Sequence, residues 1–274
     1  MSEQLGIKKV LITGAYGLIG NLVYTRLASQ PDKYDTYGAS RRAQPSERAE
    51  KIAYTVIPPE RLKVADLSDF KAMQEAVAGM GTVIHMAADP SGKNGWESVL
   101  KNNIISAHNL FEACRLAGVK RVIYASTNQV VFGYVEKDFY KRMFSGKESQ
   151  LSLEQFKPVN HTQPTRPLND YACSKVFGEA LAHMYAYEWG MSCIVLRIGW
   201  VVAEDRPRLP GGRMLWCSQR DCVQLVERCV NASEDLRFDI FFVQSDNAYN
   251  LVDIQHARDV LGYVPQDRAE DYPA

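Results

Sequence analysis

A glycine-spaced turn near the N-terminus constrains the fold of this chain more than any other feature. The apolar run that begins at Val10 leads directly into Gly14-Ala-Tyr-Gly17-Leu-Ile-Gly20. The first glycine permits a tight turn, the second lets the backbone approach a ligand, and the third lets a helix pack closely. A helix that starts there offers free N–H groups and a partial positive charge to a phosphate. We therefore expect a strand, a dinucleotide-binding turn and a helix in this order.

Strand and helix patterns alternate along most of the sequence. We expect strands at residues 8–13, 34–40, 61–67, 81–87, 119–125, 192–198 and 240–243. We expect helices at residues 18–29, 69–77, 96–117, 170–189, 220–229 and 252–261, with Asp69 near a helix start and glycines 118 and 190 at helix ends. This alternation predicts an α/β fold of the Rossmann type, a doubly wound parallel sheet with helices on both faces.

The length of 274 residues suits one large domain, and we predict a single Rossmann-type domain over residues 1–274. We expect a small C-terminal substrate-binding cap, built from residues at about 129–169 and 199–239. The stretch 134–167 is charged and then rich in proline, and we interpret it as a partly helical insertion that acts as a lid.

Composition excludes several classes of partner. The formal net charge is zero and no Lys/Arg block occurs, which argues against nucleic acid. No apolar run approaches the roughly 20 residues that cross a bilayer, and the N-terminus lacks a signal-peptide pattern. The six cysteines form no CxxC pair. We therefore predict reduced thiols in a cytoplasmic protein, with neither disulfides nor a metal site.

The end of the second expected strand bears on the choice between NAD and NADP. An acid there would bind the ribose 2′-hydroxyl, whereas an arginine accommodates a 2′-phosphate. The sequence has Ser40-Arg41-Arg42 and no acid. We predict NADP, with NAD as the alternative if both arginines are solvated surface charges. Asp66, just before Leu67, either contacts the adenine or caps a helix.

Two later groups of polar residues suit redox chemistry with such a dinucleotide. One expected strand ends in Ser126 and Thr127, and a long expected helix begins with Tyr171 and Lys175. Residues at i and i+4 share a helix face, so the phenol and the ammonium point the same way. A buried ammonium beside the phenol lowers the phenol pKa from about 10, so the tyrosine can act as a general base or acid. A nearby hydroxyl can hold the substrate oxygen.

In these motifs the chain resembles the extended short-chain dehydrogenase/reductases of the NAD-dependent epimerase/dehydratase superfamily. Besides the turn, the hydroxyls and the Tyr/Lys pair, the matching segments are Asp66-Leu67, His85-Met-Ala-Ala88 and Asn103-Ile-Ile-Ser-Ala-His-Asn109. The resemblance implies a Rossmann fold, NAD(P) and a Ser/Thr-Tyr-Lys centre supported by Asn103. It also implies a homodimer formed through two long helices, here near 102–117 and 171–189.

The resemblance further implies a set of cofactor contacts at the strand ends. They are Gly14, Tyr16, Gly17, Leu18, Ile19, Gly20, Ser40, Arg41, Arg42, Asp66, Leu67, Met86, Ala87, Ala88, Asn103, Tyr171, Lys175 and Ile198.

Within the superfamily the chain is most similar to uronate dehydrogenases and related aldose 1-dehydrogenases. The similarity lies in Ser126-Thr127-Asn128-Gln129, Tyr171-Ala-Cys-Ser-Lys175-Val-Phe-Gly-Glu179, Arg197-Ile-Gly199 and Arg213-Met-Leu215. It implies a substrate site formed by Pro90, Ser91, Asn128, Gln129, Trp200 and Arg213. In that group the arginine at the Arg213 position binds the sugar acid, since a guanidinium can hold a carboxylate with two hydrogen bonds. Alternatively, Arg213 is a surface charge.

Three departures from that group concern the substrate pocket. Gln129 replaces a substrate-binding histidine, and the large Trp200 replaces a serine. A substrate-contacting serine has its counterpart only near Pro90 or Ser91. One extra residue before Gly133 also leaves two candidates for the catalytic hydroxyl, and we choose Thr127 over Ser126.

The sequence thus predicts an NAD(P)-dependent oxidoreductase that oxidises the anomeric hydroxyl of a sugar or sugar acid to a lactone. Tyr171 would take the proton, Thr127 would hold the oxygen, and Lys175 would lower the pKa of Tyr171. One alternative is a nucleotide-sugar epimerase or dehydratase that keeps NAD(P) bound. The short region after Ile198 and the neutral Asn128 and Gln129 weigh against it. A non-catalytic, regulatory NADP-binding protein is the other alternative.

Overall fold

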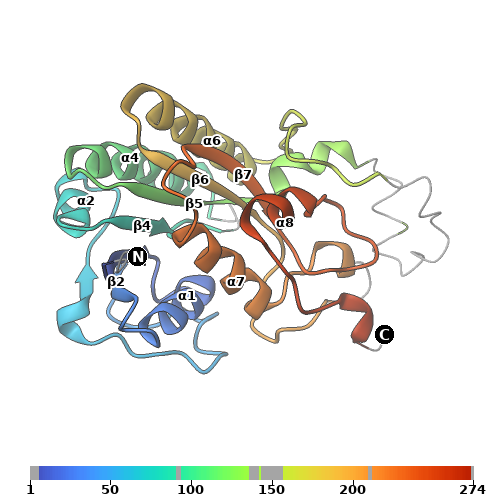
Figure 1. Cartoon of the computed structure of the whole chain (residues 1–274), viewed down its shortest axis with the longest axis horizontal. Coiled ribbons are helices and arrows are strands. Elements are labelled where there is room, and N and C mark those ends of the chain that lie inside the picture. Colours follow the sequence, from blue (N-terminus) through green and yellow to red (C-terminus); the bar gives the residue numbers. More distant parts are fainter. Residues whose placement is uncertain (1–5, 91–93, 136–141, 143–156, 209–211, 273–274) are drawn as a thin grey trace, which may run out of the picture.

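A computed structural model describes residues 6–90, 94–135, 142, 157–208 and 212–272 of the chain (Figure 1). Its centre is a seven-stranded sheet in which every neighbouring pair of strands is parallel. In spatial order the strands are β3 (Leu62–Val64), β2 (Tyr34–Ser40), β1 (Lys8–Thr13), β4 (Thr82–His85), β5 (Arg121–Thr127), β6 (Ser192–Ile198) and β7 (Phe238–Val243).

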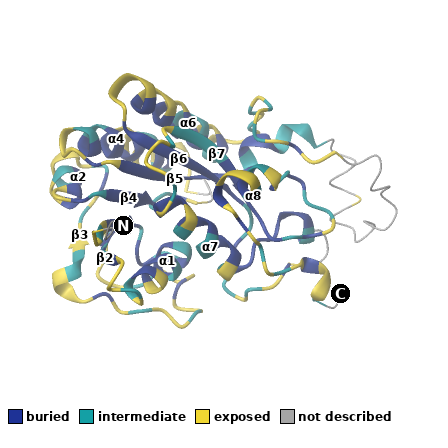
Figure 2. Cartoon of the chain, viewed as in Figure 1, coloured by how far each residue is buried: buried dark blue, intermediate teal, exposed yellow. Residues whose placement is uncertain are grey.

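Helices cover both faces of the sheet. One layer consists of α1 (Leu18–Ala28), α7 (Gln219–Val230) and α8 (Gln255–Leu261). The other consists of α2 (Phe70–Val77), α4 (Ser106–Leu116) and α6 (Asp170–Trp189). Each layer packs against one face of the sheet and forms a hydrophobic core there. In Figure 2 the central strands are largely coloured as buried. The predicted doubly wound α/β fold of the Rossmann type is therefore confirmed.

Most predicted elements match the structure closely. The strands at 8–13, 34–40 and 192–198 and the helix at 170–189 have the predicted bounds. The strand predicted at 61–67 is shorter, since only Leu62–Val64 pairs with β2, and β3 is the edge strand of the sheet within the described part of the chain. The helix predicted at 96–117 is not uniform: α3 (Trp96–Val99) passes through a π-helical turn, Leu100–Ile105, into α4.

Short polar contacts fix the ends of the helices that carry functional residues. Asn169 caps α6, since its side chain accepts a hydrogen bond from the N–H of Ala172 at 2.8 Å. Gly190 ends the same helix in the left-handed conformation, with φ of 69°. Asp69 caps α2 in the same way as Asn169 caps α6. The start of α6 is thereby fixed two residues before Tyr171.

The order of the strands locates the crevice where ligands bind in such folds. From β1 the chain moves outward to β2 and β3, then returns to β4 on the other side of β1 and continues to β7. Ligands bind at this change of direction, outside the carboxyl ends of the strands. Here those ends are the turn after Thr13 and the segment after His85.

The region predicted as a cap divides between two places. The first part of 199–239 leaves the sheet after β6, where Trp200 pairs with the buried Trp216 in an isolated β-bridge. In contrast, α7, which lies within the predicted 199–239 cap, packs against α1 on the sheet (Figure 1). Much of the predicted lid at 134–167, namely 136–141 and 143–156, lies outside the described residues.

The later part of that stretch is joined to the C-terminal elements. Val159 forms a β-bridge with Val252, and the ring of His161 stacks on the ring of His256 with centroids 3.7 Å apart and planes 11° apart. His256 Nε2 also lies 2.9 Å from Asp239 Oδ1. The potential ligand atoms of these two histidines and Asp239 lie within 4.8 Å of one another. Parallel imidazole rings direct their lone pairs side by side rather than at one ion, so we interpret the cluster as a structural contact.

None of the helices in the described part of the chain is long and apolar enough to cross a membrane.

Candidate active site

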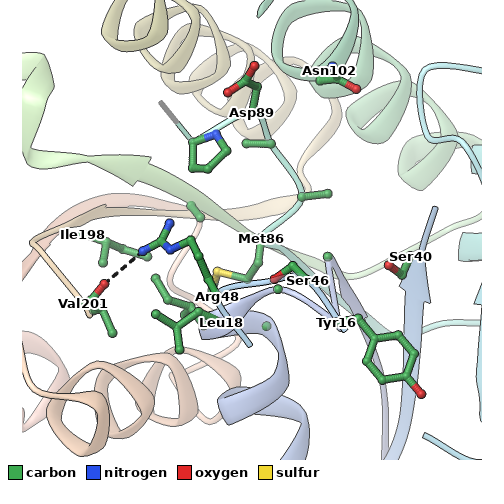
Figure 3. Close-up of a pocket in the computed structure, with 18 of the residues that line it drawn as sticks. Tyr16, Leu18, Ser40, Ser46, Arg48, Met86, Asp89, Asn102, Ile198 and Val201 are labelled. Atoms are coloured by element: carbon green, nitrogen blue, oxygen red, sulfur yellow. Dashed lines mark hydrogen bonds between the residues drawn. The ribbon is translucent and has the colours of Figure 1, made fainter. Parts of the chain in front are cut away.

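A cavity of about 820 Å³ opens along the carboxyl ends of the strands, at the change of strand direction (Figure 3). We call it the strand-end pocket. It is lined by the turn after β1, the ends of β2, β4, β5 and β6, and the first turns of α6. Cofactor and substrate sites are commonly about 300–1,000 Å³ in size. The pocket is therefore large enough for a dinucleotide or a comparable ligand.

The glycine turn has the geometry that the sequence predicts. Gly14 has φ of +67°, and a Cβ atom built there would lie 2.8 Å from the backbone N of Ala87. A Cβ atom at Gly20 would overlap the carbonyl oxygen of Gly14. Helix α1 begins without a side-chain cap and with no acidic residue in its first turn. Its first N–H groups are therefore available to an anion, which fits the diphosphate of a dinucleotide.

The predicted cofactor residues come together in the strand-end pocket. All of them line it except Asn103, which lies behind its wall. Ser40, Arg41 and Arg42 form the far end, where Arg41 Nη1 donates a hydrogen bond of 3.1 Å to Asn102 Oδ1. Asp66 lines the pocket and pairs with Lys101 at 3.0 Å, whereas the cap of α2 is Asp69.

Thr127, Tyr171 and Lys175 meet at the other end of the pocket. The Thr127 hydroxyl, which also accepts a hydrogen bond of 3.3 Å from the N–H of Gln129, lies close enough to the Tyr171 phenol to favour its ionisation. Lys175 Nζ donates a hydrogen bond of 2.8 Å to the carbonyl oxygen of Ala125 and lies 5.9 Å from the centre of the Tyr171 ring. A substrate oxygen placed between the hydroxyl and the phenol could exchange a proton with Tyr171.

Burial dominates the ionisation of this centre. It raises the pKa of Tyr171 to about 12, although the Thr127 hydroxyl and the positive charge of Arg48 oppose the rise. Burial also lowers the pKa of Lys175 to about 7. The expected lowering of the Tyr171 pKa by Lys175 is therefore not found, since loss of water penalises the charged form of both groups.

The structure separates the two candidate hydroxyls. Ser126 Oγ donates a hydrogen bond of 2.6 Å to Glu179 Oε1, and Glu179 pairs with Arg197 at 2.8 Å. All three side chains are buried. Ser126 is thus held in a buried ion-pair network, while the hydroxyl of Thr127 contacts Tyr171. The geometry favours Thr127 as the group that holds the substrate oxygen.

Asn103 supports the centre from the π-helical turn. Its Oδ1 accepts a hydrogen bond of 2.7 Å from the N–H of Asp89, and its Nδ2 donates to the Asp89 carbonyl oxygen at 3.1 Å and to Ser174 Oγ at 3.0 Å. Ser174 in turn donates to the carbonyl oxygen of Tyr171 at 2.7 Å. Asn103 therefore joins the end of β4 to the first turn of α6, and π-helical turns often occur at such sites.

The predicted substrate residues are not all at the pocket surface. Pro90, Gln129 and Trp200 line it. Asn128 is fully buried outside the lining, and Ser91 lies outside the described residues. Arg213 is also outside the lining and donates a hydrogen bond of 3.0 Å to the carbonyl oxygen of Tyr272. Their roles toward a substrate stay predictions.

Sequence reasoning missed four charged residues that line the pocket: Glu47, Arg48, Asp89 and Arg208. Asp89 is buried at the end of β4, where its carboxylate accepts hydrogen bonds from Ser98 at 2.6 Å and Asn94 at 2.9 Å. Its position directly after Ala88 could have identified it, because polar residues at strand ends of such sheets face the ligand. No local motif marks Arg48 or Arg208.

The sheet order, the glycine turn and the Thr-Tyr-Lys centre together define a Rossmann-fold dehydrogenase that uses a nicotinamide dinucleotide. Comparison of sequences then places the chain more narrowly. The NAD dependent epimerase/dehydratase family matches residues 10–220, and the chain belongs to this family.

Two relatives align along nearly the whole chain. An NAD-dependent glucose-6-phosphate dehydrogenase of Haloferax volcanii is 34% identical over 264 residues, which are 96% of this chain and 95% of the relative. A uronate dehydrogenase of Pseudomonas putida is 30% identical over 268 residues, which are 97% of this chain and 87% of the relative.

The known structures agree with the sequence comparison. The crystal structure of uronate dehydrogenase from Agrobacterium tumefaciens has a TM-score of 0.76 and 28% identity, and the match covers 97% of this chain and 86% of that one. A mutant of the same enzyme, complexed with NAD, has a TM-score of 0.75 over 97% of this chain and 87% of that one.

Proposed function

We propose that this protein oxidises the anomeric hydroxyl of a sugar or sugar acid to a lactone, with NAD(P) as the oxidant. The observation that carries the proposal is the meeting of Thr127, Tyr171 and Lys175 in a pocket that also contains the glycine turn. The names of the whole-length relatives support it, since they include dehydrogenases of glucose 6-phosphate, L-arabinose and uronate.

In this mechanism the protein positions the substrate and moves one proton. Thr127 and Tyr171 hold the anomeric oxygen, and Tyr171 accepts its proton. Lys175, fixed by Ala125, favours the phenolate when its own amine is protonated. A bound dinucleotide supplies the nicotinamide ring that accepts the hydride. Burial of Thr127 and Lys175 keeps water away from the reacting atoms.

Nucleotide-sugar isomerisation is less well supported. An uncharacterized UDP-glucose epimerase of Bacillus subtilis is 26% identical, but the match covers only 76% of this chain and 61% of the relative. An enzyme of that kind keeps its dinucleotide through purification. Mass spectrometry of the denatured, purified protein would show such a cofactor, and we expect none at stoichiometric level.

We propose NADP as the preferred cofactor. Ser40, Arg41 and Arg42 line the pocket at the end of β2, and this segment has no acid to bind a ribose 2′-hydroxyl. The relatives' names do not decide the matter, because one specifies NAD and another NAD(P)(+).

We also propose a cytoplasmic homodimer formed through α4 and α6. These helices pack side by side and leave four large apolar side chains exposed, namely Leu116, Met184, Tyr187 and Trp189. A second copy would cover this surface. The six cysteines are all free, which suits a reducing compartment. Light scattering of the purified protein, compared with a Tyr187→Glu variant, tests the dimer.

The test of the activity is cofactor reduction at 340 nm. NADP and NAD would each be offered with glucuronate, galacturonate, arabinose, galactose, glucose and glucose 6-phosphate. We expect reduction with at least one sugar, and its loss in Tyr171→Phe while NADPH still binds. Silence with every sugar despite NADPH binding would contradict the substrate class. Near-full turnover by Tyr171→Phe would contradict the mechanism.

A further inference from the structure

Lys175 places a charged group in the interior of the protein with few partners. Its side chain is buried, and its Nζ donates a hydrogen bond of 2.8 Å to the carbonyl oxygen of Ala125. An ammonium has three N–H donors, so this bond satisfies one of them. Among the described residues, no carboxylate forms an ion pair with Lys175. A buried charge without a counter-charge is costly, so another group has to stabilise it.

Two tyrosine rings lie beside this ammonium. Lys175 Nζ lies over the ring of Tyr124, 5.1 Å from its centroid, and 5.9 Å from the centroid of the Tyr171 ring. The face of an aromatic ring carries partial negative charge and attracts a cation within about 6 Å, most strongly where water is excluded. Tyr124 is the nearer of the two, and it belongs to β5 and does not line the strand-end pocket. It can therefore act on Lys175 without contacting a ligand.

The ring of Tyr124 is fixed by packing from three elements. The His85 ring of β4 stacks on it with centroids 5.8 Å apart and planes 14° apart, and the Phe111 ring of α4 lies at the same centroid distance with a tilt of 39°. On the side of α6, a Cβ atom at Gly178 would overlap the ring. The buried hydroxyl of Tyr124 has no hydrogen-bond partner among the described residues. The interaction with Lys175 therefore depends on the ring and not on the hydroxyl.

We propose that the aromatic ring of Tyr124 holds the ammonium of Lys175 in place and stabilises its positive charge, which makes Tyr124 a positioning residue for the catalytic centre. The consequence for the reaction rests on the proposed function, since there a protonated Lys175 favours the phenolate of Tyr171. Burial lowers the pKa of Lys175 to about 7. Without the attraction of the ring, the same burial would remove the proton at still lower pH.

The other ionisable groups around Lys175 do not replace the ring. Burial, together with the charge of Lys175, lowers the pKa of His85 to about 3, so His85 is neutral above about pH 5. Burial raises the pKa of both tyrosines, which are therefore neutral as well. Glu179, one turn further along α6, is paired with Arg197 at 2.8 Å. The charge of Lys175 is thus compensated by the aromatic rings and by one carbonyl oxygen.

Urea unfolding measures the protonation of Lys175 without any turnover. Each chain is compared with the same chain carrying Lys175→Met. The pH at which the difference in unfolding free energy begins to rise marks the folded pKa of Lys175. Tyr124→Phe keeps the ring and Tyr124→Leu removes it. Replacement of Tyr124 by a trifluorophenylalanine keeps the shape of the ring but weakens the negative charge of its face. Phe111→Leu, which removes a neighbouring buried ring and keeps Tyr124, is the matched control.

We expect this rise to begin near pH 7 in wild type, in Tyr124→Phe and in the control. In Tyr124→Leu and in the fluorinated protein it should begin about one pH unit lower, because the charged amine loses the attraction of the ring. The fluorinated protein carries the test if Tyr124→Leu does not fold. A rise that begins in these proteins at the same pH as in the control, or at a higher pH, would show that the proposal is wrong.

Steady-state kinetics test the consequence for the reaction. At pH 8 a fall of one unit in the pKa of Lys175 leaves roughly a tenth as much protonated amine, so we expect kcat of the fluorinated protein to fall about 10-fold with little change in KM. Tyr124→Phe should restore most of kcat. If the rise in unfolding free energy moves but kcat does not change, Tyr124 is not a positioning residue for the reaction. Absence of sugar oxidation in wild type would contradict the proposed function but would leave the unfolding result standing.

Discussion

Ser126 donates a hydrogen bond of 2.6 Å to Glu179, within a buried network that also contains Arg197. Because Ser126 is held in this network and Thr127 lies beside Tyr171, we propose separate roles for the two neighbouring hydroxyls. Ser126 would stabilise the fold, and Thr127 would take part in the reaction.

Substitution of each hydroxyl should separate these duties. We expect Thr127→Val to lower kcat at least about 100-fold, because the donor that holds the substrate oxygen is lost. Ser126→Ala should keep most of kcat but lower the free energy of unfolding by about 1–3 kcal/mol, since the buried Glu179 loses a partner. Steady-state kinetics and urea unfolding measure the two effects. A large loss of kcat in Ser126→Ala, with little loss in Thr127→Val, would show that Ser126 is the catalytic hydroxyl.

Asn103 should act as a positioning residue. Asn103→Ala removes its two hydrogen bonds with the backbone N–H and carbonyl of Asp89, which costs about 1–3 kcal/mol of unfolding free energy. It also frees the first turn of α6, so we expect kcat to fall while the dissociation constant of NADPH changes little. Kinetics and calorimetry on the same preparation test this. An equal loss in Asn102→Ala, whose amide lies at the far end of the pocket, would contradict a specific role.

The buried Lys175 should make the stability of the ligand-free protein depend on pH. Its folded pKa is about 7 and its ordinary value 10.5, so between these values the unfolded chain holds a proton that the folded protein lacks. The contribution of Lys175 to the free energy of unfolding therefore rises with pH, by up to about 1.4 kcal/mol per pH unit. Urea unfolding from pH 7 to 9.5 should show a steeper rise in wild type than in Lys175→Met. The exposed Lys120→Met is the control, and equal slopes in wild type and Lys175→Met would refute the shift.

The end of β2 should set the choice of cofactor. Replacing Ser40 by Asp and Arg41 by Ala introduces an acid for the ribose 2′-hydroxyl and removes a charge for a 2′-phosphate. We expect kcat/KM for NADP to fall about 10- to 100-fold relative to NAD, as for the loss of a charged hydrogen bond. The ratio of the two rates measures the effect. A ratio that stays the same would mean that these side chains remain in solvent.

Local sequence patterns predicted the central part of the fold well, because its elements are bounded by local signals. Helix α6 lies between Asn169, which caps it, and Gly190, which ends it, so its bounds required no tertiary information. The fully buried β5 and β6 each contain a central apolar run, at 122–125 and 193–196, as expected for strands covered on both faces. The glycine turn and Tyr171/Lys175 were found because their chemistry depends on fixed spacing.

Features that depend on distant contacts were not predicted. The π-helical turn at Leu100–Ile105 has no local signal, and its meaning comes from the bonds of Asn103 to Asp89 and Ser174. Arg48 reaches the pocket only because the loop 41–58 is tied to Tyr16 and Asn21. The partner of Arg213, the carbonyl of Tyr272, lies 59 residues away in the sequence. In each case the position of the side chain depends on contacts with residues far away in the sequence, and no local pattern predicts such contacts.

The contact between α6 and the sheet also limits which sequences can preserve this site. A Cβ atom at Gly178 would overlap the ring and hydroxyl of the buried Tyr124. A methyl group there would lift the helix from β5 and carry Tyr171 and Lys175 with it, although Gly178 does not line the pocket. The close contact between Gly178 and Tyr124 therefore sets how near α6 lies to β5, and with it the positions of Tyr171 and Lys175. Random mutagenesis selected only for activity should therefore recover Gly178 together with a tyrosine or a smaller residue at 124.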